Sequence, residues 1–67
     1  MTEDELKIGK KVRVSPNNEY YGDWARMECV ISGLHKKTKD KHIDITIEDE
    51  LGMECDGWKS IDLEEIL

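Results

Sequence analysis

The stretch HIDITIE, residues 42–48, alternates polar and apolar side chains without a fault, and its three isoleucines are β-branched. Alternation of this kind predicts a β-strand with one buried face, and β-branched side chains favour an extended backbone. The run ends at Asp49-Glu50-Leu51-Gly52, a polar turn with a glycine at its end, and resumes at Met53-Glu54-Cys55. The two runs therefore predict a β-hairpin, and the rest of the chain is placed around it.

Two further strands are expected before this hairpin. In the segment 10–14, Val12 and Val14 share one face and the basic residues take the other. Pro16 ends that strand, because proline has no backbone N–H to donate to a sheet. A second strand is expected from residue 25 until Gly33 interrupts the pattern.

The C-terminal segment 57–66 supplies the last strand of the expected fold. Together these elements predict an all-β protein, a small five-stranded antiparallel barrel formed as one domain by residues 1–67. Thr2 and Glu5 have the spacing of a capping box, which favours one helical turn in residues 1–5. So short a helix is only marginally stable, and the alternative is a frayed tail. The side chains expected inside are Val12, Val14, Met27, Cys29, Ile31, Ile43, Ile45, Ile47 and Leu63.

Length and composition restrict what the chain can do. A folded chain of 67 residues buries only about 60% of the surface that its unfolded form exposes, so it can build one small core. That core leaves few residues to line a deep substrate cleft, and we therefore expect no enzyme activity and no cofactor. The net charge of −6 disfavours general binding to phosphate backbones.

The cysteines and the hydropathy pattern indicate the compartment. Cys29 and Cys55 form neither a C-x-x-C pair nor a dense framework, so we expect buried thiols in a reducing environment, with a single disulfide as the alternative. The acidic N-terminal residues do not resemble a secretory signal, and no apolar run approaches 18 residues. These features predict a cytoplasmic protein with no membrane partner.

The order of the expected elements is strand, long loop, strand, polar loop, strand, tight turn, strand, short turn and terminal strand. This order resembles that of the Src-homology-3-like (SH3-like) small barrels, including their Tudor-like and KOW-like relatives. The segments 8–14 and 57–66 are similar to the first strand and the closing segment of such barrels. The resemblance implies one tight helical turn at residues 60–63. Peptide-binding members carry a proline where this chain has Lys59-Ser60, so the resemblance does not extend to proline-rich ligands.

Residue types suited to metal binding or catalysis do not converge in the sequence. The candidate metal ligands are His35, His42, Cys29 and Cys55. They match no usual zinc spacing, so no metal site is expected. The acids of residues 49–56 lack the D-x-D-x-D-G order of a calcium loop and indicate a solvated face. Nucleophilic catalysis is not expected either, because both cysteines are predicted to point inward.

Three of the four aromatic residues gather in the irregular segment 15–24. Exposed aromatic rings near a carboxylate can anchor a basic or apolar group of a partner. We therefore expect a non-enzymatic protein-interaction module or small regulatory protein, similar to acidic accessory proteins of phage and bacterial genomes. The candidate residues are Tyr20, Tyr21, Asp23, Trp24 and Trp58. The alternative for this segment is that it covers the barrel and that Trp24 belongs to the core.

Charge is unevenly distributed along the chain, which suggests a second function. Eight of the ten bases fall in the two segments 7–13 and 36–41, whereas residues 44–65 hold nine acids and one lysine. If the loop of residues 36–41 lies near Lys10, the bases form one end of the molecule and could bind nucleic acid, with the loop aromatics stacking on bases. The candidates are Lys10, Lys11, Arg13, Lys36, Lys37, Lys39 and Lys41. A role as a minor subunit of a larger complex is the third hypothesis.

Overall fold

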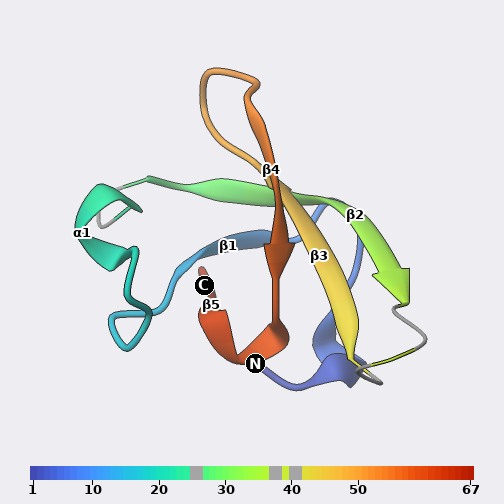
Figure 1. Ribbon diagram of the computed structural model, residues 1–67. Coiled ribbons are helices and arrows are strands. Elements are labelled where there is room, and N and C mark those ends of the chain that lie inside the picture. The colour runs from blue at the N-terminus through green and yellow to red at the C-terminus, as the bar shows by residue number, and fades with distance from the viewer. Residues whose placement is uncertain (25–26, 37–38, 40–41) are drawn as a thin grey trace.

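Five strands form one antiparallel sheet in the computed structural model, which describes residues 1–24, 27–36, 39 and 42–67. The strands are β1 (Lys11–Val14), β2 (Cys29–Lys36), β3 (Ile43–Glu48), β4 (Glu54–Trp58) and β5 (Leu63–Glu65). Their order in the sheet is β4-β3-β2-β1-β5 (Figure 1). The helical pieces are single turns, η1 (Glu3–Glu5), α1 (Tyr21–Trp24) and η2 (Ser60–Asp62). The all-β prediction is therefore confirmed, and so is the tight turn before the last strand.

The sheet is open between its two edge strands. Within the described residues β4 pairs only with β3 and β5 pairs only with β1. The sheet nevertheless curves around a shared core, and the hairpin of β3 and β4 projects beyond it (Figure 1). The described part of the chain contains no helix that is long and apolar enough to cross a membrane.

Strand β2 does not end at Gly33 as the sequence predicted. It continues to Lys36, with a register shift between Ile31 and Gly33. A Cβ atom at position 33 would lie 3.0 Å from His35 Nε2 and 3.2 Å from Thr46 Cβ. Glycine at this position therefore allows the close approach of β3 at an irregularity of the ladder, and it does not mark a strand end.

Strand β4 is also shifted from its predicted position, from residues 53–55 to Glu54–Trp58. Ile45 pairs with Trp58 and Ile47 with Cys55, so two steps along β3 oppose three steps along β4. Gly57 has a φ of +87°, a conformation that glycine adopts at low cost and that suits a bulge. This extra residue is what brings Trp58 to the core face beside Ile45.

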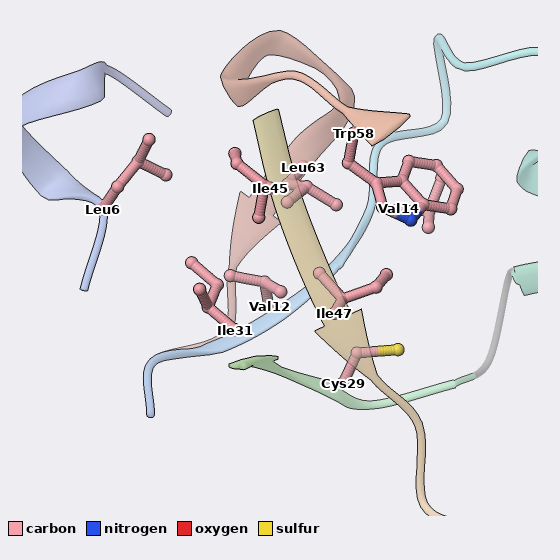
Figure 2. Packing of buried hydrophobic residues seen from close by; sticks show 9 residues of the cluster. All are labelled: Leu6, Val12, Val14, Cys29, Ile31, Ile45, Ile47, Trp58 and Leu63. Atoms are coloured by element: carbon pink, nitrogen blue, oxygen red, sulfur yellow. The ribbon is translucent and has the colours of Figure 1, made fainter. Parts of the chain in front are cut away.

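The core contains seven of the nine predicted side chains and two that were not predicted. Leu6 and Trp58 join the cluster shown in Figure 2. Met27 was wrongly placed inside. It is 39% exposed, because β2 begins only at Cys29 and Met27 therefore lies outside the strand. Ile43 is only partly buried, because it is the first residue of β3 and packs at the periphery of the cluster.

Candidate functional site

A groove with a volume of about 560 Å³ lies between the segment that carries α1 and the end of β4. Its lining residues come from the first long loop, from β4 and from the turn that follows β4. They are Asn18, Glu19, Tyr20, Trp24, Cys55, Asp56, Gly57, Trp58, Lys59 and Asp62. Residues more than 30 positions apart in the sequence therefore form one surface, which the alternation of the strands alone does not reveal.

Three aromatic rings meet at this groove. Trp58 is 5% exposed, and the rings of Trp24 and Tyr20 stand edge-on to it, with ring centroids 5.5 Å and 6.5 Å away. Edge-to-face pairs at such distances are favourable because the positive edge of one ring meets the negative face of another. The predicted grouping of these three residues is present in the structure.

The two hypotheses for the aromatic segment each describe part of it. Trp24 is half-buried and packs against the core, as the covering alternative required. Tyr20 is 56% exposed, as an anchor for a partner would be. Tyr21 is half-buried and Asp23 exposed, and neither lines the groove. The groove therefore includes three of the five residues proposed from the sequence.

Local hydrogen bonds hold the aromatic segment in place. The Asn18 side-chain oxygen accepts the Tyr20 N–H at 2.8 Å, and the Asn18 carbonyl accepts the Tyr21 N–H at 3.1 Å. Asn18 in turn donates its own N–H to the Ser15 carbonyl at 3.0 Å. Asparagine favours turns of this kind because its short side chain bonds to the backbone two residues on. Tyr20 is thus carried on an ordered turn although its ring faces solvent.

Carboxylates outnumber bases among the described residues that line the groove. Glu19, Asp56 and Asp62 contribute three acids, and Lys59 contributes one amine. The Asp62 carboxylate also accepts the Lys59 backbone N–H at 2.9 Å, which fixes the turn η2 at one end of the groove. Sequence reasoning missed these polar residues, because Asp56 and Asp62 resemble ordinary acids of a turn.

Trp58 carries an unusual polar atom. Its indole Nε1–H is buried and donates to no acceptor among the described residues. A buried donor without a partner costs about 1–3 kcal/mol. The residue that packs the end of the core thus keeps one unsatisfied hydrogen-bond donor.

The basic candidates that the structure describes differ in their contacts. Lys10 Nζ lies 3.3 Å from Glu65 and donates to the Glu5 carbonyl at 2.7 Å, and Arg13 pairs with Glu64 at 3.3 Å. Lys11, Lys36 and Lys39 are exposed, whereas Lys37 and Lys41 lie outside the described residues.

Lys10 precedes β1 and lies beside the middle of β2. Its carbonyl accepts the Ile31 N–H, and Ile31 is five residues before Lys36 on β2. Most of the loop of residues 36–41 lies outside the described residues, so its closeness to Lys10 stays a prediction.

The two cysteines differ from each other, and only Cys29 lies where it was predicted. Cys29 is buried, and desolvation together with the nearby Asp49 and Glu50 carboxylates raises its thiol pKa to about 11. Cys55 was predicted to point inward but is exposed, because β4 is an edge strand and Cys55 opens onto the groove. Both thiols are free.

The acidic hairpin has a structural use. Asp49 Oδ1 accepts the backbone N–H groups of Leu51 and Met53 at 2.9 and 3.0 Å, which closes the turn between β3 and β4.

Across the part of the chain that the structure describes, no three His, Cys, Asp or Glu residues are grouped closely enough to hold a metal ion.

The chain matches no protein-family model, and no curated protein or solved structure shows significant similarity to it.

Proposed function

We propose that this chain is a non-enzymatic protein-binding module, built on a small barrel of the SH3-like kind, and that it binds its partner in the aromatic groove. The SH3-like assignment is supported by the strand order β4-β3-β2-β1-β5 and by the single helical turn before β5. Curvature of the sheet around one core is compatible with it (Figure 1).

The observation that carries the proposal is the groove itself. Partner-binding sites concentrate aromatic residues that are rigid and partly accessible, because such rings bury a large area at little entropic cost. Here Trp58 is fixed in the core and Trp24 packs on the core, while Tyr20 offers its exposed ring at the same place. A binding surface of this kind needs no deep cleft, which a chain of 67 residues cannot readily build.

The test is selection from a displayed library of random seven-residue peptides on the purified chain. We expect enriched peptides that bind the unmodified chain and lose affinity for the Tyr20→Ala variant. Leu51→Ala is the control, because Leu51 is an exposed apolar side chain at the hairpin turn and does not line the groove. Because Tyr20 is 56% exposed, its replacement should cost only its edge-to-face pair with Trp58, about 0.5–1.5 kcal/mol, and leave the chain folded. Enriched peptides that bind the Tyr20→Ala variant equally well would refute the proposal.

A further inference from the structure

We propose that the occupant of the groove is an extended, basic peptide segment that adds to the free edge of β4 and seats one Lys or Arg side chain against Tyr20 and Trp24. The inference rests on the proposed function and specifies its partner. Two independent features support it. The edge of β4 is unpaired among the described residues, and the groove that adjoins β4 is lined by aromatic rings and carboxylates.

β4 presents an unpaired edge. It pairs with β3 alone, and none of its residues forms a backbone hydrogen bond to another described element. In an antiparallel pair about half of the backbone groups of a strand point away from the partner strand, so this edge offers unused donors and acceptors. An extended peptide can take them up as an added strand. The groove adjoins this strand, because Cys55, Asp56 and Gly57 of β4 line it together with Tyr20.

The edge of β4 is only partly protected against an added strand. Soluble proteins block such edges with lysine, proline, other charged side chains or bulges. Residues 54–58 contain no lysine or proline, and their protection consists of two acids, Glu54 and Asp56, and of the bulge at Gly57. Gly57 leaves the backbone open, since a Cβ atom at that position would meet nothing within 4 Å. A basic strand can therefore approach, whereas a second copy of this chain, with its net charge of −6, is repelled.

The groove also suits one cationic side chain. The exposed ring of Tyr20 and the half-buried ring of Trp24 provide faces for a cation and for the methylenes that carry it. Glu19 and Asp56 supply negative charge at the same surface, and among the described residues Lys59 is the single base that lines it. An acidic peptide or a nucleic-acid phosphate would meet these carboxylates and be disfavoured.

Cys55 provides a reporter for the geometry. It belongs to β4, it is exposed and it lines the groove, whereas the other thiol, Cys29, is buried. A peptide strand laid along β4 covers Cys55, and we expect it to slow alkylation of that thiol by iodoacetamide. Binding elsewhere on the molecule leaves the alkylation rate unchanged.

The experiment uses the peptides selected on the unmodified chain as probes. We expect them to share one Lys or Arg position, and replacement of that residue by norleucine should weaken binding about tenfold. Only alternate amides of an added strand face β4. Methylation of the backbone nitrogen of the peptide should therefore abolish binding at every second position and have little effect at the positions between them. Asp56→Asn should weaken binding about threefold to tenfold, whereas Asp23→Asn, a change of an exposed acid outside the groove, should not.

The outcomes separate this inference from the function on which it rests. Peptides that depend on Tyr20 but lack a basic position, or that tolerate N-methylation at every amide, would overturn the inference and leave the protein-binding function standing. Peptides that leave Cys55 fully reactive would also overturn it. Failure to enrich any peptide that depends on Tyr20 would remove both proposals together.

Discussion

At the scale of single residues, the two thiols show how position in the sheet decides chemistry. Cys29 starts the interior strand β2 and is 1% exposed, whereas Cys55 lies on an edge strand and opens to solvent. Alternation predicted both to be inward, because it reports which side of a strand a residue takes and not whether that side is covered. The covering depends on the neighbouring strand, and β4 has a neighbour on one side only.

We therefore expect one fast and one protected thiol. With an aromatic disulfide reagent at pH 8, Cys55 should react within the time of an ordinary exposed cysteine, and Cys29 should react only as the protein unfolds. The thiolate is the reactive form, and Cys29 is both buried and largely protonated at this pH since its pKa is raised to about 11. Cys55→Ser should remove the fast phase. Equal rates for both thiols in the folded protein would contradict the structure.

The raised pKa of Cys29 also implies a loss of stability at alkaline pH. The folded-state pKa, about 11, lies above the reference value of 9.0, so the contribution of Cys29 is complete below pH 9 and is lost as the pH rises towards 11. Two pKa units correspond to about 3 kcal/mol of unfolding free energy. Urea unfolding followed between pH 8 and 11 measures this loss. Since lysines and tyrosines titrate in the same range, Cys29→Val is the control and should show a shallower decline.

At the scale of elements, the sequence identified the strands better than their ends. The central strand β3 and the Val12–Val14 face were predictable, because each alternates without interruption and contains β-branched residues. The start of β2 and the position of β4 could not be predicted. In β4 the bulge at Gly57 moves Trp58 into register with Ile45. A bulge depends on pairing between two strands, which a single strand's pattern does not contain.

The candidate site divides in the same way. The aromatic cluster was visible in the composition of segment 15–24, and Trp58 was expected beside it. The acids of the groove could not be predicted from the sequence. Asp56 reaches the groove because β4 is shifted, and Asp62 reaches it because of the turn η2. The ion pairs of Lys10 and Arg13 were not predictable either, because only the pairing of β1 with β5 brings Glu65 and Glu64 near them.

The hairpin of β3 and β4 gives a prediction for one element. Asp49→Ala removes the acceptor for two backbone N–H groups at the turn, and we expect it to lower the free energy of unfolding by about 1–2 kcal/mol. Asp49→Asn keeps a side-chain oxygen acceptor and should cost less. Urea denaturation of both variants measures the difference. A loss in the Asn variant as large as in the Ala variant would show that the charge, and not the hydrogen bonds, matters at this turn.

At the scale of the whole molecule, net charge and individual ion pairs act in opposite directions. The two ion pairs of β5 lie at the surface, and such pairs contribute about 0–1 kcal/mol each. For a sphere with the observed radius of gyration of 11.0 Å, Coulomb's law in water gives a self-repulsion of about 5 kcal/mol for a net charge of −6. Part of that repulsion persists in the unfolded chain. At low salt we expect the remainder to exceed the contribution of the two ion pairs, so that the charges of this protein together oppose folding.

Salt should therefore stabilise this protein although it weakens its ion pairs. In 10 mM salt the screening length is about 30 Å, which matches the longest extent of 31 Å, so all the acids repel one another. In 0.5 M sodium chloride the screening length is a few ångströms, and we expect the free energy of unfolding in urea to rise by about 1–2 kcal/mol. At pH 4.8, the isoelectric point that the sequence implies, the net repulsion vanishes and the gain should disappear. Stability that falls with salt at pH 7 would mean that the pairs of Lys10 and Arg13 outweigh the repulsion of the remaining carboxylates.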